Sequence, residues 1–234
     1  MTPEYEVKSG VLFFVHPPRM SGNNSEEIMS CAQKTDFFKA AGFDFAVAID
    51  FSEQFSKIKG TEFLEILRNN CSMQFLACGS DFRLGYKADT GVAEISSFCS
   101  KNGLDFAECA PVLYAQNRIS SSFIRKAIQA ADFDVLPFCL GHDWEIDAGE
   151  YKWCLHQSEK YLLLTAAPSG NIQLPPSKEY ECLIYLKDKN QSVLHADFCV
   201  ESDFLRLEIP PEQFKSGSSE LTQFIHRIKI IRSK

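Results

Sequence analysis

Short apolar runs alternate with segments of helical period through the first 145 residues. The apolar runs cover residues 11–15, 45–49 and 73–78, and the helical segments that follow them begin near Ser25, Thr61 and Gly91. Buried strands that alternate with helices are typical of crossover units on a parallel sheet. A fourth strand pattern begins at Asp105 and leads into two helices, one from about residue 121 and one over residues 132–140. The pattern predicts an α/β domain over residues 1–145.

The ends of these helices are predicted from capping residues. Ser and Thr followed by acidic side chains favour a helix start, and glycine favours a helix end because it adopts left-handed backbone angles. The predicted starts are Ser25 with Glu26 and Glu27, and Thr61 with Glu62; the predicted ends are Gly42, Gly103 and Gly141.

Beyond Trp144 the pattern changes to strands. Residues 151–157, 160–166, 179–186, 192–200 and 203–209 alternate or run apolar at strand length, and Pro, Gly, Ser and Asn clusters separate them. This spacing predicts a small antiparallel β-barrel or sandwich over residues 146–234. For residues 218–231 a capped helix and a last strand fit the pattern equally well.

Composition narrows the class of protein. The 234 residues are 45% hydrophobic and 24% charged, which excludes a disordered tail or a disulfide miniprotein. No apolar run approaches the roughly 20 residues of a membrane helix, and the first residues lack the pattern of a secretory signal. We therefore expect a cytoplasmic protein with no membrane partner.

Charge and cysteine usage exclude two further classes. A net charge of -7 and a pI near 5.3 argue against nucleic acid as a partner, because phosphate-tracking surfaces need surplus Lys and Arg. The nine cysteines are scattered singly, with no Cys-x-x-Cys pair, so we expect reduced, buried thiols and no zinc site.

The loop after residues 73–78 carries one candidate site. It reads Gly-Ser-Asp-Phe-Arg-Leu-Gly from Gly79 to Gly85. The glycines permit a tight turn, while Asp81, Phe82 and Arg83 offer an acceptor, a flat apolar ring and a cation. Such a loop suits a ligand that joins an aromatic ring to a phosphate. By spacing alone, a turn in which Asp81 and Arg83 pair with each other is an equal alternative.

The segment from Ile119 to Arg125 carries the second candidate. Ser120, Ser121 and Ser122 stand at a predicted helix start, where free N–H groups and the helix dipole favour an anion. Arg125 follows Ser121 by four residues and so shares its helical face. A serine N-cap with a solvated Arg is the alternative, and it leaves the other serines unexplained.

Histidines give weaker signals. The segment from His16 to Arg19, His-Pro-Pro-Arg, follows the first apolar run and is more often a structural corner than a catalytic element. The remaining histidines have no metal-ligand spacing, so we interpret them as packing or surface residues and predict no metal bound by the protein itself.

Together these segments resemble the bacterial FAD synthetases, usually bifunctional riboflavin kinase/FAD synthetases. The family pattern is a strand with His-Pro-x-Arg, then Gly-x-Asp-Phe-x-Phe-Gly, then Ile-Ser-Ser-Thr-x-Ile-Arg and a Leu-Gly exit. Here Leu84 replaces the second Phe, Ser122 replaces Thr, and Leu140 and Gly141 supply the exit. The matches occur in the family's order between residues 11 and 141.

The resemblance implies a Rossmann-like nucleotidyltransferase domain, residues 1–145, followed by a riboflavin-kinase-like β-barrel, residues 146–234. It implies transfer of AMP from ATP to FMN, giving FAD and pyrophosphate, with Mg²⁺ accompanying ATP. Small molecules are then the partners, and the oligomeric state stays open. The implied catalytic residues are Ser121, Ser122 and Arg125, and Ser120 joins them in the implied ATP-binding set. The implied flavin-binding residues are His16, Arg19, Gly79, Asp81, Phe82 and Arg83.

The chain departs from the family pattern in two places. The family's early His-x-Gly-His motif is absent, so we expect either a lost first unit or a start upstream of Met1. In the barrel, residues 168–171 only partly match the family's Gly-x-Pro-Thr-Ala-Asn, and Glu208 is a poor match to its catalytic Glu. We therefore expect a barrel that serves as scaffold without riboflavin kinase activity.

Two alternatives to FMN adenylyltransferase remain at this stage. A flavin- or adenylate-binding protein that kept the fold and lost the reaction would explain the missing His-x-Gly-His. An adenylyltransferase for another phosphorylated acceptor would fit the serine-rich helix start, although the Asp-Phe loop favours a flavin.

Overall fold

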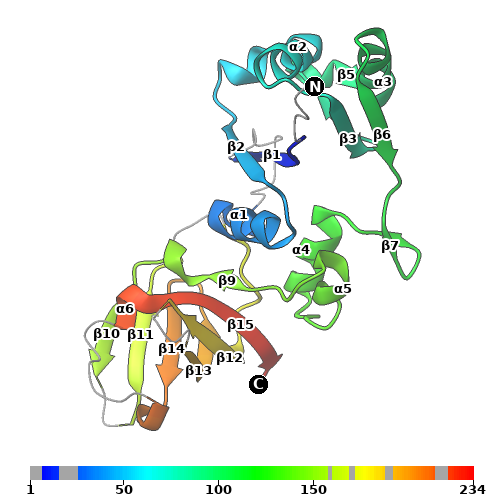
Figure 1. Cartoon of the computed structure of the whole chain (residues 1–234). Helices are drawn as coiled ribbons and strands as arrows, with labels where there is room; N and C mark the ends of the chain where they lie inside the picture. The colour runs from blue at the N-terminus through cyan, green and yellow to red at the C-terminus, as the bar shows by residue number, and fades with distance from the viewer. Residues whose placement is uncertain (1–6, 16–25, 158–159, 169–171, 188–191, 214–220) are drawn as a thin grey trace. The chain divides into compact units, whose positions relative to one another are not determined.

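The computed structural model describes residues 7–15, 26–157, 160–168, 172–187, 192–213 and 221–234 (Figure 1). The chain divides into two compact units. The first unit comprises Met1–Ser9, Gly22–Phe45 and Ile119–Lys234, and the second unit comprises Gly10–Ser21 and Ala46–Arg118. These units are defined by contacts in space, whereas the predicted division into residues 1–145 and 146–234 follows the order of the chain. That division stays a prediction.

The described part of the second unit contains small sheets and two α-helices. Strand β3 (Phe75–Gly79) pairs in parallel with β6 (Asp105–Cys109), and β1 (Gly10–Val15) pairs with β2 (Phe45–Asp50). Helices α2 (Gly60–Asn70) and α3 (Val92–Lys101) pack on a core of Leu64, Leu84, Ile95 and Cys99. The short pairs are β4 (Arg83–Leu84) with β5 (Thr90–Gly91), and β7 (Leu113–Tyr114) with β8 (Asn117–Arg118).

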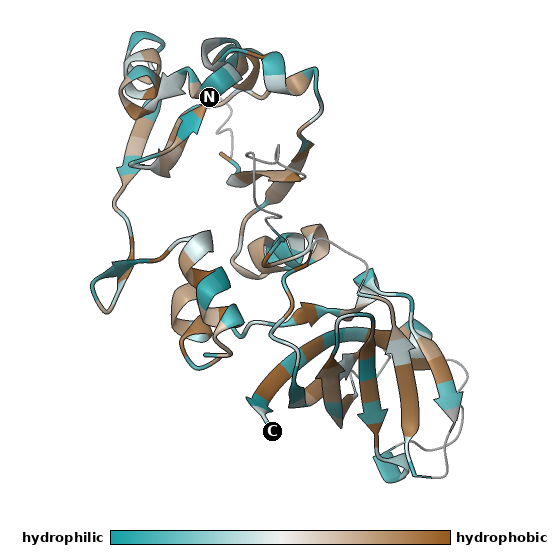
Figure 2. Cartoon of the chain, turned by 180° about the vertical axis from the view of Figure 1, so that it is seen from behind, coloured by the Kyte–Doolittle hydropathy of each residue, from teal (hydrophilic) through white to brown (hydrophobic). Residues whose placement is uncertain are grey.

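The first unit is built on a curled antiparallel sheet with the strand order β10-β11-β14-β13-β12-β15-β9. Its strands are β9 (Ile146–Asp147), β10 (Cys154–Gln157), β11 (Leu162–Ala166), β12 (Glu179–Leu186), β13 (Val193–Val200), β14 (Leu205–Ile209) and β15 (Ile225–Ser233). Hydrophobic and hydrophilic positions alternate along these strands in Figure 2, and the buried members, such as Tyr180, Phe198 and Leu207, fill the core.

Four α-helices lie in the described part of the first unit. They are α1 (Cys31–Ala40), α4 (Ser121–Gln129), α5 (Leu136–Leu140) and α6 (Leu221–Phe224). Single turns of 3-10 helix lie in the two units at Phe55–Lys57, Tyr86–Ala88, Ala148–Glu150 and Pro211–Gln213. None of the helices in the described ranges is long and apolar enough to cross a membrane.

The strands predicted from the apolar pattern are confirmed. The parallel pairing of β3 with β6 and the antiparallel sheet also match the expected mixed α/β architecture. For residues 218–231 a helix and a strand fitted the pattern equally well. The described part of this segment contains both, because α6 leads directly into β15. Gly42, Gly103 and Gly141 have φ angles of +88°, +66° and +76°, the left-handed values expected at helix ends.

Two predicted helix starts, near Ser25 and Asp132, are wrong, and the one near Thr61 differs by one residue. Ser25 lies outside the described residues, and α1 begins at Cys31, because Ser30 and Gln33 form a reciprocal capping box there. Helix α2 begins one residue before Thr61, because the Gly60 N–H donates to the Asp89 carboxylate at 3.0 Å.

The helix expected from Asp132 begins only at Leu136. Ala131 has a φ of +56°, a left-handed conformation that interrupts the helical path. Pro137, in the first turn of α5, suits a helix start because its missing N–H needs no partner there.

Candidate functional site

Helix α4 has a capped and well-packed N-terminus. Three apolar side chains at helical spacing, Ile124, Ala127 and Ile128, are buried and fix the helix. Ser120 is the N-cap, and its hydroxyl oxygen accepts from the Phe123 N–H at 3.2 Å. The prediction of a helix from residue 121 is therefore confirmed.

Ser120 and its two neighbours have different roles at this terminus. Ser120 is explained by capping alone. Ser121 and Ser122 occupy the first turn with exposed side chains, where backbone N–H groups have no acceptor four residues back. The positive end of the helix dipole adds to these donors, so the terminus can hold an anion.

Arg125, on the same helix, is half-buried, and a hydrogen bond fixes one side of its guanidinium. Its Nε donates to the backbone oxygen of Glu26 at 2.8 Å. Within the described residues the two terminal nitrogens of the guanidinium have no hydrogen-bond or ion-pair partner, so none of those residues occupies the fork with which an arginine binds phosphate oxygens. Burial raises the pKa of the Glu26 carboxyl, and the positive charge of Arg125 opposes that rise.

The loop from Gly79 to Gly85 follows the carboxyl end of β3 in the second unit. Backbone bonds shape it: the Ser80 N–H donates to the Cys109 oxygen at 3.2 Å, and the Phe82 N–H to the Gly79 oxygen at 3.0 Å. Phe82 is half-buried and packs against the core of this unit. Its ring therefore forms part of the packing around this core.

Asp81 pairs with a residue that the sequence reasoning missed. Its carboxylate lies 2.6 Å from Nη2 of Arg118, and this contact lowers the pKa of Asp81 and raises that of Arg118. The alternative of an Asp81–Arg83 pair is not what forms, because the Arg83 Nε donates to the Ala88 oxygen at 3.2 Å. Arg118 lies far from Asp81 in the sequence, so no local pattern indicated this pair.

The two motifs fall in different units. Asp81 and Arg118 belong to the second unit and Ser120 to Arg125 to the first, so each part of the predicted site is described separately. The predicted flavin-binding residues His16 and Arg19 lie outside the described residues, as do residues 169–171 of the barrel motif.

The remaining histidines make ordinary contacts. The His142 ring packs on Phe37 with centroids 4.9 Å apart, and His156 contacts the Thr165 hydroxyl at 3.0 Å. Burial lowers the pKa of His226, and neighbouring Arg227 adds to that effect. Over the described ranges, no group of three or more His, Cys, Asp or Glu side chains is arranged to hold a metal ion.

Glu208, the poor match to a kinase catalytic residue, is already engaged. It lies on β14 and forms an ion pair with Arg206 on the same strand. Arg206 also reaches Glu179 at 3.3 Å, so Glu208 belongs to a group of charges on the sheet.

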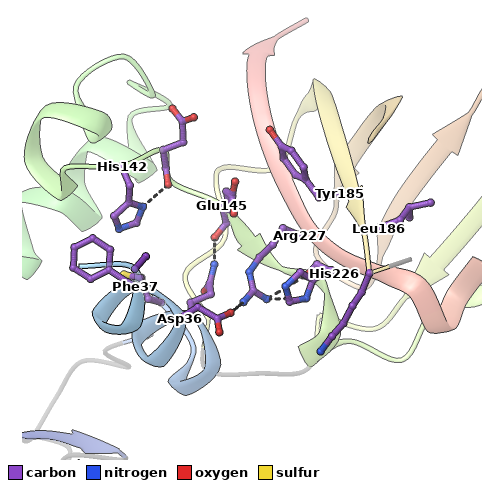
Figure 3. Close-up of a pocket in the computed structure, with 13 residues that line it drawn as sticks. Asp36, Phe37, His142, Glu145, Tyr185, Leu186, His226 and Arg227 are labelled. Carbon is purple, nitrogen blue, oxygen red and sulfur yellow. Dashed lines mark hydrogen bonds and ion pairs between the residues drawn. The ribbon is translucent and has the colours of Figure 1, made fainter. Parts of the chain in front are cut away.

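A cavity that the sequence reasoning did not anticipate lies in the first unit, between α1, residues 142–145 and strands β12 and β15 (Figure 3). Its volume is about 630 Å³. Phe37, His142 and Tyr185 supply rings, and Asp36 and Arg227 form an ion pair across it at 3.1 Å. Asp36 and Arg227 are 191 residues apart in sequence, which hides their contact from any local pattern.

Comparison with known proteins identifies the family. A sequence model described as FAD synthetase matches residues 2–123, just over half of the chain. A bifunctional riboflavin kinase/FMN adenylyltransferase of Haemophilus influenzae is 26% identical over 147 residues, covering 61% of this chain and 48% of that protein. One of Pseudomonas fluorescens is 27% identical over 175 residues, covering 73% and 54%.

A FAD synthetase of Listeria monocytogenes is 22% identical over 146 residues, covering 61% of this chain and 59% of that protein. The chain spans about half the length of the curated relatives it matches. Among solved structures, a macrolide-efflux protein from Streptococcus pneumoniae matches with a TM-score of 0.72 at 15% identity, covering 95% of this chain and 80% of that one. That likeness concerns the fold alone, whereas the sequence match over residues 2–123 shows that the chain belongs to the FAD synthetase family.

Proposed function

We propose that this chain is an FMN adenylyltransferase, which transfers AMP from ATP to the phosphate of FMN. The observation that carries the proposal is the start of α4, where Arg125 is held through Nε, its terminal fork has no partner among the described residues, and Ser121 and Ser122 lie one turn earlier on the same helix. The FAD synthetase family and the relatives named FMN adenylyltransferase support ATP and FMN as the substrates.

The reaction needs no covalent enzyme intermediate. An oxygen of the FMN phosphate attacks the α-phosphorus of ATP in line, a new P–O bond forms, and the bond to the β-phosphate breaks to release pyrophosphate. The protein then acts by positioning and by compensating charge. The N-terminus of α4 and the Arg125 fork supply donors to the phosphates, and Mg²⁺ enters as part of the substrate Mg-ATP.

We assign the flavin side of the site to the loop after β3. Gly79 keeps the turn small, Asp81 and Arg83 supply polar groups, and Phe82 supplies an apolar face. The ion pair from Asp81 to Arg118 supports this assignment, because it fixes the Asp81 carboxylate on the loop. His16 and Arg19 complete the proposed flavin set.

The domain arrangement belongs to the same proposal. Residues 1–145 form a Rossmann-like nucleotidyltransferase domain, and residues 146–234 form a riboflavin-kinase-like β-barrel. The partial match of residues 168–171 to the family's Gly-x-Pro-Thr-Ala-Asn stretch supports a barrel without kinase chemistry.

The test is synthesis of FAD by the purified full chain. With FMN and Mg-ATP we expect FAD and pyrophosphate in equal amounts, and with riboflavin and Mg-ATP we expect no FMN. Arg125→Ala should lower kcat/KM by about 10²–10³, the usual loss of one preorganised charge-stabilising donor. Arg125→Lys should recover only part, because an ammonium lacks the planar fork.

Lys126→Ala is the matched control, since Lys126 is the exposed neighbour on the same helix. Equal losses of kcat/KM in the Arg125→Ala and Lys126→Ala variants would contradict the role proposed for Arg125. Quenching of FMN fluorescence without any FAD formed would instead point to a flavin-binding protein without turnover. A wild-type chain that neither makes FAD nor binds FMN would overturn the proposal.

A further inference from the structure

A short segment joins the curled sheet to Arg125. We call residues 26–30, which precede α1, the strap. Glu27 forms an isolated parallel bridge with Ile172, and its backbone oxygen accepts from the Gln173 N–H at 2.8 Å. The Trp144 Nε1 donates to the backbone oxygen of Ile28 at 3.2 Å. Backbone and indole contacts therefore fix the middle of the strap to the barrel side of this unit.

A buried polar network fixes the far end of the strap. The Ser30 hydroxyl donates to the carboxylate of Asp147 on β9. Asp147 also pairs with Nη1 of Arg227 at 2.6 Å, and Nη2 of Arg227 reaches Asp36 on α1 at 3.1 Å. Asp147 and Arg227 are only 3% and 6% exposed, so water screens this pair little. Figure 3 shows Arg227 reaching toward Asp36 from β15.

The near end of the strap holds Arg125. The acceptor for the Arg125 Nε is the backbone oxygen of Glu26, the first residue of the strap. A guanidinium is planar, so a hydrogen bond at Nε helps set the plane in which the two terminal nitrogens lie. The position of the Glu26 carbonyl thus helps to set the direction of the fork.

We infer that Asp147 and Arg227 are positioning residues for Arg125 and act through the strap. This inference rests on the proposed function for its kinetic consequence. A buried ion pair often adds little net stability, and fixing one arrangement of neighbouring elements is a known use of such pairs. Here the arrangement runs from β9 and β15 through Ser30 to Glu26. The curled sheet, to which we assign no kinase activity, then has a role in adenylyl transfer.

The inference gives Arg227→Met and Asp147→Asn specific effects. Either change releases the network without substituting Arg125, Ser121 or Ser122 themselves. We expect kcat for FAD formation to fall by about tenfold or more, since small misplacements of a charge-stabilising group cost up to about 10² in rate. The KM for FMN should change little. Arg227→Lys should recover part of the rate, because a lysine can still pair with Asp147.

A readout that does not depend on turnover is the Nε–H signal of Arg125 in a ¹H–¹⁵N spectrum. In the wild-type chain its exchange with water should be slowed by the bond to Glu26, and both variants should speed that exchange. Ser30→Ala, which cuts the same network at a serine, should act in the same direction. This milder variant serves if the changes at Arg227 or Asp147 prevent folding.

The control is Arg232→Met on the same strand. Arg232 pairs with Glu181 at 2.8 Å, its side chain is 70% exposed, and its pair lies outside the network. If the network variants match this control in both kcat and Nε–H exchange, the inference is overturned. If the wild-type chain makes no FAD, the proposed function fails, and the Nε–H exchange alone decides the inference.

Discussion

At the scale of single residues, Ser120 combines a capping role that the structure shows with an ATP-binding role that we propose. Ser120→Ala removes the acceptor for the Phe123 N–H and should cost about 1 kcal/mol of stability. In a chain of this size that corresponds to a fall of about 2–4 °C in Tm, measured by thermal unfolding. Ser120→Asp keeps a capping oxygen and should leave Tm near that of the wild type.

The same Asp variant separates the two roles. A carboxylate at position 120 would face the ATP phosphates, and like charges at close range cost about 1–4 kcal/mol near a protein surface. We expect the KM for Mg-ATP to rise by about tenfold or more in Ser120→Asp. An unchanged KM would show that ATP phosphates bind away from the start of α4.

Glu145 offers a pH-dependent prediction at the cavity of Figure 3. Burial raises the pKa of its carboxyl, and the nearby charge of Arg227 opposes that rise. The folded state therefore holds this proton more tightly than the unfolded state does. Its contribution to stability falls as pH rises from the ordinary glutamate value, about 4.3, through the raised folded pKa.

We accordingly expect Glu145→Gln to have a higher Tm than the wild type at pH 7. The gain should shrink as pH falls and vanish near pH 4, where the wild-type carboxyl is protonated as well. Thermal unfolding between pH 4 and 8 measures this difference. Glu212→Gln, at an exposed position of the same unit, is the control and should follow the wild type throughout. A difference that stays constant with pH would contradict the assignment.

Residue types within short segments of the sequence predicted part of the site, and residues far away in the sequence complete it. The serines and Arg125 could be predicted because an N-cap signal and an i, i+4 spacing are local. The partners of Arg125 and Asp81, namely Glu26 and Arg118, could not be predicted in this way. Each lies far along the chain, and Glu26 contributes only a backbone oxygen, which every residue carries.

At the scale of elements, a close approach of two glycines sets how α2 begins. Gly85 has a φ of +85°, and a Cβ added there would collide with the Gly60 backbone, coming within 2.6 Å of its Cα. Gly85→Ala therefore combines a left-handed strain of about 1–2 kcal/mol with a backbone clash. We expect a total loss of about 3 kcal/mol or more in chemical denaturation.

Gly103→Ala is the matched control for this prediction. Gly103 lies in the same unit at a φ of +66°, and nothing lies within 4 Å of its added Cβ. This variant should show the left-handed cost alone. Equal losses in the two variants would mean that the turn after β4 moves away from α2 freely.

Periodicity succeeded for strands and was less reliable for helix starts. Alternation along β12, for example, gave its bounds of Glu179–Leu186 directly, because one face must be buried. The starts of α1 and α2 depend on competition between capping groups. The box of Ser30 with Gln33 fixes the start of α1, and the carboxylate of Asp89 takes part at that of α2.

At the scale of the whole molecule, the compact units do not follow the order of the chain. Residues 26–45 belong with the curled sheet, although the pattern along the sequence places them among the crossover units. The buried network of Asp147 and Arg227 explains part of this membership, since it ties α1 to β9 and β15. Composition and periodicity carry no signal for such a contact.

This division predicts where destabilisation spreads. Leu207 on β14 and Ile95 on α3 are both fully buried, one in each unit. Leu207→Ala and Ile95→Ala should each cost about 2–5 kcal/mol. In hydrogen exchange followed by mass spectrometry, we expect Leu207→Ala to speed exchange in β12, α1 and α4 together. Ile95→Ala should instead speed exchange in α2, β3 and β6.

The response of α1 decides between the two descriptions of the chain. If the compact units are the cooperative ones, α1 follows Leu207→Ala, because its capping box and its contact with Arg227 depend on the sheet. If the boundary near residue 145 governs unfolding, α1 follows Ile95→Ala instead. Equal acceleration along the whole chain in both variants would show one cooperative molecule and would contradict separate units.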